Sequence, residues 1–96
     1  MIRSFKDALA ADLFFDRQTS ATRRFPSFLR NVAQRKLQYV NAAATLLDLR
    51  SPPGNRLEAL KGDRRGQHSI RINRQWRVCF RWTPDGPEAV EIVDYH

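Results

Sequence analysis

The stretch EIVDYH, residues 91–96, ends in three side chains that can move or orient protons: Asp94, Tyr95 and His96. His96 titrates near neutrality, so it can act as a general base or a general acid. The run EAVEIVDYH alternates as a strand does, and a strand paired within a sheet is held by ladder hydrogen bonds. We therefore expect positioned side chains at its tip. The alternative is that His96 is an incidental terminal residue.

The positive charge of the chain is concentrated in one segment. The 96 residues carry a net charge of +7, and residues 56–81 alone carry +6. That segment holds eight basic residues and two acids: Arg56, Lys61, Arg64, Arg65, Arg71, Arg74, Arg77 and Arg81 against Glu58 and Asp63. The planar guanidinium group of arginine binds phosphate well, so we expect a polyanionic partner such as nucleic acid or the ribosome. The alternative is a solvated surface of an ordinary basic protein.

Composition and length narrow the class of protein. Apolar residues make up 42% of the 96 residues, which is typical of a globular fold, and the length predicts a single domain spanning residues 1–96. No apolar run is long enough to span a membrane, and charged residues interrupt the N-terminal stretch, so we expect a cytoplasmic protein. The single Cys79 excludes an internal disulfide, and we interpret it as an inert small residue. No metal site or other cofactor is predicted.

The first half of the chain has helical periodicity. Residues 2–4 suggest a short strand, and Ser4 with Asp7 resembles a capping box before a helix that runs to about Phe15. RQTSATRR is interpreted as a polar break. From Pro26 to Leu47, apolar residues recur every three or four positions and predict a helix of about six turns: Leu29, Val32, Ala33, Leu37, Val40, Ala44 and Leu47.

After Gly54 the period changes from 3.6 to 2, which predicts strands at 57–60, 67–73, 75–82 and 88–96. In QWRVCFRW, residues 76, 78, 80 and 82 form an apolar face, and Arg77, Cys79 and Arg81 lie on the other. Short connections favour an antiparallel meander. The expected fold class is α+β, with two N-terminal helices packed on one face of a twisted antiparallel sheet.

Several motifs together resemble the HigB-type toxins, also called plasmid-maintenance killer proteins, of the RelE/ParE superfamily. They are MIRSF, the FP before the long helix, PPGNRLEALKGDR, SIRIN with QWR, and the DYH of residues 94–96. The resemblance implies a RelE-like fold of helices against an antiparallel sheet. It also implies metal-independent cleavage of mRNA in the ribosomal A site. A helix-turn-helix antitoxin of the HigA type is the implied partner, alongside the ribosome and mRNA.

The resemblance also assigns candidate site residues. The positions that match the family's catalytic or mRNA-contacting residues are Lys61, Gln75, Arg77, Asp94, Tyr95 and His96. Gln75 is expected to approach the mRNA. Arg64, Arg65, Arg71 and Arg74 are expected to position the protein on ribosomal RNA. Glu58 is a departure, because the best-known members carry a His three residues before this Lys. Either Glu58 takes over that role or a two-His mechanism does not apply; Glu58 as an ordinary exposed strand residue is the alternative.

These residue types suffice for RNA cleavage without a metal. A base removes the proton of the 2′-hydroxyl, an acid protonates the departing 5′ oxygen, and cations stabilise the charge on the phosphate. Glu58 and His96 are candidates for base and acid, and Arg77 and Lys61 for holding the phosphate. Tyr95 can donate a hydrogen bond or stack on a base, and Asp94 can hold a neighbouring base or backbone.

Two other functions fit the same resemblance. One is a ParE-like toxin that poisons DNA gyrase without catalysis, although the Tyr95–His96 pair favours a nuclease. The other is a decayed toxin that only binds its antitoxin, which the departure at Glu58 keeps open. For the nuclease we expect an exposed site without a deep pocket, so that the ribosome must orient the RNA.

Overall fold

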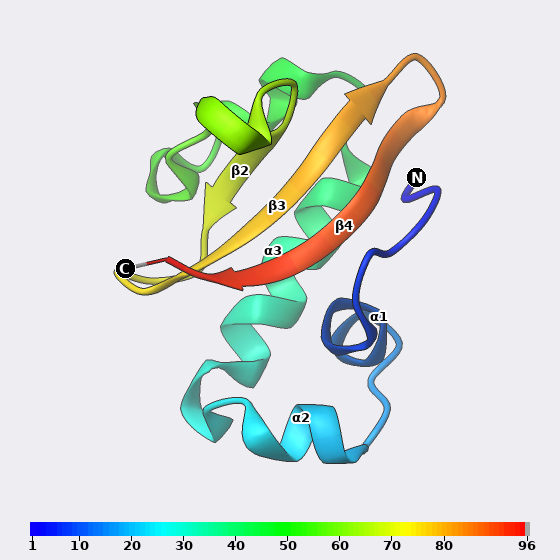
Figure 1. The fold of residues 1–96 in the computed structure, drawn as a ribbon, viewed down its shortest axis with the longest axis vertical. Helices are drawn as coiled ribbons and strands as arrows, with labels where there is room; N and C mark the ends of the chain where they lie inside the picture. Colours follow the sequence, from blue (N-terminus) through cyan, green and yellow to red (C-terminus); the bar gives the residue numbers. More distant parts are fainter. Residues whose placement is uncertain (96) are drawn as a thin grey trace.

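The computed structural model describes residues 1–95 and places three α-helices before a sheet of four strands (Figure 1). The helices are α1 (Ala8–Phe14), α2 (Ser20–Arg24) and α3 (Arg30–Ala42), and the strands are β1 (Glu58–Ala59), β2 (His68–Arg71), β3 (Trp76–Thr83) and β4 (Gly86–Asp94). Helix α1 packs on β4 and α3 on β3, on the same side of the sheet. This confirms the predicted α+β architecture. No helix in the described part of the chain is long and apolar enough to cross a membrane.

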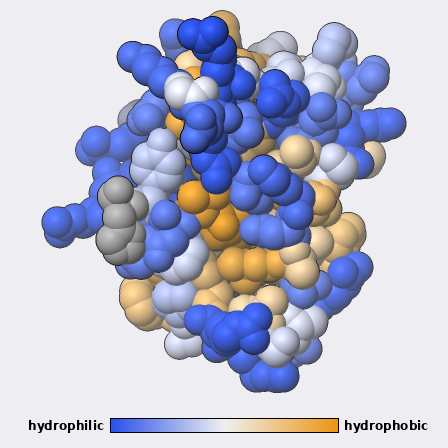
Figure 2. Space-filling model, in the orientation of Figure 1, coloured by the Kyte–Doolittle hydropathy of each residue, from blue (hydrophilic) through white to orange (hydrophobic). Residues whose placement is uncertain are grey.

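The sheet is the predicted antiparallel meander, with strand order β1-β2-β3-β4. The register places Ile70 opposite Val78 and Arg71 opposite Arg77. Ile70 and Val78 are fully buried in the core under the helices, and alternation turns the two arginines to the other face. Hydrophilic side chains predominate on the molecular face seen in Figure 2, and apolar ones gather toward its centre and lower half.

The expected strand at residues 2–4 does not form. Phe5 instead makes an isolated parallel bridge with Val90, and the backbone N–H of Lys6 donates to the Val90 carbonyl at 2.8 Å. The N-terminal segment therefore follows the free edge of β4 without becoming a ladder strand. Three residues are too few to distinguish a strand from an extended segment by pattern alone.

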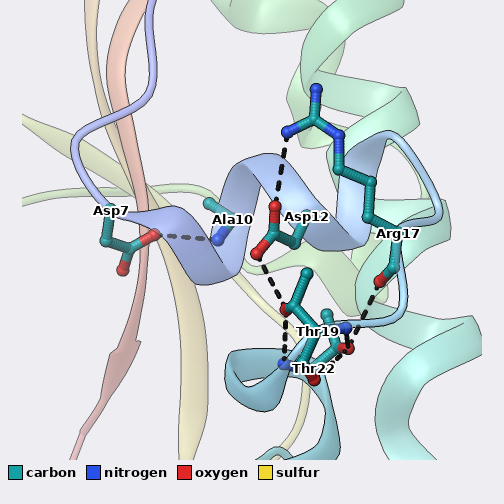
Figure 3. A network of polar contacts seen from close by, with 6 residues as sticks. All are labelled: Asp7, Ala10, Asp12, Arg17, Thr19 and Thr22. Carbon is teal, nitrogen blue, oxygen red and sulfur yellow. Dashed lines mark hydrogen bonds and ion pairs between the residues drawn. The ribbon is translucent and has the colours of Figure 1, made fainter.

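The helix α1 is capped by Asp7, so the expectation of a cap at Ser4 is wrong. One Asp7 carboxylate oxygen accepts from the N–H of Ala10 at 2.8 Å (Figure 3), and the other accepts from the N–H of Ile92 at 3.3 Å. Ser4 is engaged with β4 instead, because its hydroxyl accepts from the N–H of Ala89 at 2.9 Å. Burial raises the pKa of Asp7, while its two backbone hydrogen bonds act in the opposite direction.

The segment interpreted as a polar break contains α2. Thr19 caps this helix, and its hydroxyl also donates to Asp12 of α1 at 2.9 Å. Asp12 in turn forms an ion pair with Arg17 at 3.3 Å, and the Thr22 hydroxyl donates to the Arg17 carbonyl (Figure 3). This polar network fixes α2 against α1. Thr and Ser look like loop residues in the sequence, but at an N-cap they start a helix.

The long helix is shorter than predicted at both ends. Residues 27–29 form a 3₁₀ turn, and α3 ends at Ala42. The carboxylate of Asp48 accepts from the N–H groups of Ala44 and Thr45, and this capping interaction begins a new 3₁₀ turn over Leu46–Arg50. Leu47 is therefore 59% exposed, although it continued the helical spacing in the sequence.

A buried lysine fastens the connection between α3 and the sheet. Lys36 is 7% exposed and its ammonium donates to the side chain of Asn55 at 2.6 Å. The Asn55 amide donates to the carbonyls of Leu49 and Ser51, both at 3.2 Å. Burial lowers the pKa of Lys36, and the neighbouring Arg35 lowers it further. These bonds fix the backbone just before β1, the strand that carries Glu58.

Substituting Asp7 tests whether its carboxylate links the helix to the sheet. Asp7→Ala removes the cap and should lower the free energy of unfolding by about 1–2 kcal/mol, whereas Asp7→Asn keeps a good capping residue and should cost less than half of that. Because the pKa of Asp7 is raised in the folded state, the wild type should lose stability relative to Asp7→Asn as the pH rises through that value. Urea unfolding at several pH values measures both effects. Equal stabilities of the two variants would contradict the capping role.

Candidate active site

The side chain of Arg77 is the best-anchored cation on the sheet face opposite the helices. It is 9% exposed, and its Nε donates to the hydroxyl of Ser69 on β2 at 2.7 Å. Its Nη2 donates to the carbonyl of Arg56 at 2.7 Å and lies 3.9 Å from the Glu58 carboxylate. These two hydrogen bonds use two of the five N–H donors of the guanidinium. The expectation of an exposed arginine is therefore wrong at this position.

Arg71 lies directly opposite Arg77 in the β2–β3 register, and both side chains are on the same face. Like charges directly opposite each other on paired strands destabilise a sheet. Arg77 forms an ion pair with Glu58, whose side chain is 53% exposed and therefore compensates the charge only weakly. This pair of cations makes a favourable place for an anion.

A cleft of about 440 Å³ lies beside Arg77, lined by Glu58, Ala59, Leu60, Lys61 and Tyr95. The guanidinium of Arg77 is 5.9 Å from the centre of the Tyr95 ring. The structure thus brings together four of the predicted catalytic side chains, from β1, the turn that follows it, β3 and the end of β4. Four of the five lining residues are exposed, so the cleft is open to solvent, as expected for a site without a deep pocket.

The tip of β4 is held by Gln75, which precedes β3. The Gln75 carbonyl accepts from the N–H of Tyr95, and its side-chain amide donates to Asp94 at 3.1 Å. The predicted approach of Gln75 to mRNA stays a prediction, and in the structure its contacts position Asp94 and Tyr95. Asp94 lies at the end of β4, opposite Trp76. The predicted catalytic residue His96 lies outside the described residues.

The turn that carries Lys61 is held in place by the ion pair between Arg64 and Glu91 of β4. Arg64 donates to Glu91 of β4 at 3.0 Å and to Gln67 at 3.1 Å. The hydrogen bond that Arg64 donates to Glu91 is the largest cause of the raised pKa of Arg64. The ammonium of Lys6 lies 3.4 Å from the same Glu91 oxygen. Glu91 is shared by these two cations, so it offsets part of the charge of Arg64, and the predicted contact of Arg64 with ribosomal RNA stays a prediction.

The remaining candidates on this face differ in exposure. Arg65 and Arg74 are exposed and available to a partner, and Arg71 is half-buried. Cys79 is fully buried, and burial raises the pKa of its thiol to about 11, which agrees with an unreactive residue. Among residues 1–95, no three His, Cys, Asp or Glu side chains come together as metal ligands would.

A family model described as the RelE-like toxin of the type II toxin–antitoxin system HigB matches residues 3–96. The chain belongs to this family of HigB-like toxins. It is 40% identical over 96 residues to Toxin HigB-1 of Vibrio cholerae serotype O1, an alignment that covers the whole chain and 98% of that protein. An uncharacterized protein of Haemophilus influenzae is 41% identical over 59 residues, which cover 62% of this chain and 58% of that protein. As a type II toxin, the HigB-like protein has an antitoxin as partner.

Three residues that support the site were missed from the sequence of this HigB-like toxin: Ser69, Arg56 and Glu91. Ser69 shares the polar face of its strand with Arg71, so the alternation gave a weak signal for it. Arg56 contributes its backbone carbonyl, which no residue type reveals. Glu91 reaches Arg64 across 27 positions of the chain, a separation that local patterns do not bridge.

Glu91→Gln tests whether the ion pair holds the turn that carries Lys61. The amides of Arg64 and Arg65 are hydrogen-bonded within this turn, so their hydrogen exchange reports its opening. Losing a charged hydrogen-bond partner should speed their exchange by about tenfold. The matched control is Lys6→Gln, which removes the other cation of Glu91 and leaves the turn in place. Equal exchange in wild type and Glu91→Gln would show that the ion pair does not hold the turn.

Proposed function

We propose that this HigB-like toxin is a ribosome-dependent, metal-independent endoribonuclease that cleaves mRNA in the ribosomal A site. The observation that carries the proposal is the anchored Arg77, opposite Arg71 and beside the cleft that contains Lys61, Tyr95 and Glu58. A phosphodiester placed between these cations would compensate their mutual repulsion. It would then lie next to a carboxylate and a phenol, which can serve proton transfer and base stacking.

In the proposed reaction the 2′-hydroxyl attacks the adjacent phosphorus and the bond from phosphorus to the 5′ oxygen breaks. Glu58 takes the proton of the 2′-hydroxyl, and its place on the wall of the cleft, 3.9 Å from Arg77, supports this role. His96 gives a proton to the departing 5′ oxygen, since an imidazole titrates near neutrality. Arg77 and Lys61 stabilise the charge on the phosphate. The products are a 2′,3′-cyclic phosphate and a 5′-hydroxyl end.

The remaining candidates act on binding and position. Tyr95 is 40% exposed, so its ring can stack on a base of the mRNA. Asp94 and Gln75 hold the tip of β4 through their mutual hydrogen bond. Arg65, Arg71 and Arg74 contact ribosomal RNA, and Arg64 contributes mainly through its bond to Glu91. The ribosome orients the mRNA in the cleft, which supplies a large part of the rate enhancement.

Brief induction of the toxin followed by mapping of transcript 5′ ends tests the activity. New 5′-hydroxyl ends should fall inside translated codons. In a purified system, His96→Gln and Glu58→Gln should each lower cleavage by about a hundredfold, as is typical of losing a general acid or base. Asp63→Asn is the matched control, because it neutralises an exposed acid in the neighbouring turn. Intact transcripts with damaged DNA would instead identify a gyrase poison. A silent Glu58→Gln would remove Glu58 from the mechanism.

The antitoxin is proposed to be a HigA-like helix-turn-helix protein encoded beside this chain. A net charge of +7 on 96 residues favours a partner that compensates it. A tagged toxin should co-purify with that neighbouring protein when both are expressed. Expression of the toxin alone should arrest growth. Normal growth at a high level of folded, unprotected toxin would contradict both the toxicity and the need for a partner.

A further inference from the structure

A second basic surface lies on the helical side of the molecule, away from the cleft. Between Asp16 and Asp48 the sequence holds six basic residues and no Asp or Glu. Three of the six are engaged: Arg17 with Asp12, Lys36 with Asn55, and Arg30 with the Thr22 carbonyl at 3.1 Å. The other three, Arg23, Arg24 and Arg35, are exposed.

An exposed row of side chains on α3 and on the turn before it follows α2 in the chain. Phe28, Asn31, Arg35 and Gln38 recur at intervals of three or four residues, and all four are exposed. Phe28 is 79% exposed, the largest value among the large apolar side chains of residues 1–95. The α1–α2 network drawn in Figure 3 fixes α2, so that Arg23 and Arg24 are presented from a rigid element.

The composition of this row favours RNA over a protein partner. Arginine and amide side chains are typical contacts to phosphate and sugar, and an exposed aromatic ring can stack on an unpaired base. Phe and Arg also occur at protein interfaces, so the preference for RNA rests on the three exposed arginines and on the lack of Asp or Glu between Asp16 and Asp48. Acidic side chains are missing from the row itself, and the exposed Asp16 lies beside Asn31 in a neighbouring pocket that Arg17 and Arg30 also line.

We propose that the exposed α2–α3 surface, centred on Arg24, Phe28 and Arg35, binds the backbone of ribosomal RNA as a second contact, independent of the cleft. The inference rests on the proposed function, because ribosomal RNA is the RNA that a toxin in the A site meets. The sheet separates this surface from the Gly62–Arg64 turn, and the molecule measures 32 × 27 × 27 Å (Figure 1). A single phosphate group cannot contact both sides of the sheet, so the toxin binds ribosomal RNA through two separate surfaces.

The test measures binding to purified small ribosomal subunits, without mRNA, at several salt concentrations. Each lost phosphate contact lowers the slope of log affinity against log salt by about 0.7–0.9. Arg24→Gln with Arg35→Gln should therefore lower the slope by about 1.4–1.8. The matched control is Arg3→Gln with Arg50→Gln, two exposed arginines elsewhere, which should change it by less than half as much. Phe28→Ser should weaken binding by about tenfold without changing the slope, because stacking releases no counterions.

The outcomes separate this inference from the proposed function. Equal slopes for the two double variants, with mRNA still cleaved on ribosomes, would overturn only the second contact. Loss of antitoxin binding with an unchanged slope on the small subunit would assign the surface to an acidic protein and also overturn it. If the unaltered toxin neither binds the small subunit nor cleaves mRNA, both proposals fail. Circular dichroism and thermal melting establish that each variant is folded, since all the altered side chains are exposed.

Discussion

The buried guanidinium of Arg77 links segments from all parts of the sheet. It sits on β3, bonds to Ser69 of β2 and to the backbone before β1, and lies beside the ring of Tyr95 at the end of β4. A charge at 9% exposure is tolerated only where hydrogen bonds satisfy it, and removing it would leave Ser69 without its partner. The same cation therefore stabilises the packing of β1, β2 and β3 and also lies beside the candidate site. Loss of activity in a variant of Arg77 would not by itself identify a catalytic role.

The acids of the chain are used mainly inside the protein. Residues 82–96 contain four acids and no Lys or Arg, and β4 carries most of them. Glu91 accepts contacts from Lys6 and Arg64, and Asp94 accepts from Gln75. This arrangement neutralises basic groups that shape the fold and leaves Arg65, Arg74 and the α2–α3 arginines exposed. The net positive charge consequently appears on both sides of the sheet rather than on one face.

Regular patterns in the sequence predicted the sheet well and the helix ends poorly. The alternation through residues 76–82 gave the correct apolar face, because period-2 patterning reflects burial directly. Trp76 and Trp82 pack against the core from partly buried positions, close to the expectation. Leu47 kept a helical spacing beyond the real end of α3, since the capping by Asp48 depends on two backbone N–H groups and not on hydrophobicity. Family motifs identified Lys61, Arg77 and Tyr95, which meet at or beside the cleft with the departing residue Glu58. The burial of Arg77 and the Arg64–Glu91 pair come from long-range packing.

The attachment of the N-terminal segment to β4 has a consequence for synthesis. Asp7 caps α1 and also bonds to Ile92, and Ser4 bonds to Ala89, each pair being 85 positions apart. During synthesis the N-terminal helices leave the exit tunnel first. Strand β4, against which α1 packs, leaves after β1, β2 and β3. While residues 86–95 are still in the exit tunnel, the backbone bond of Tyr95 to Gln75 cannot form and the cleft lacks one wall. A nascent chain is thus unable to assemble the site until β4 has left the exit tunnel.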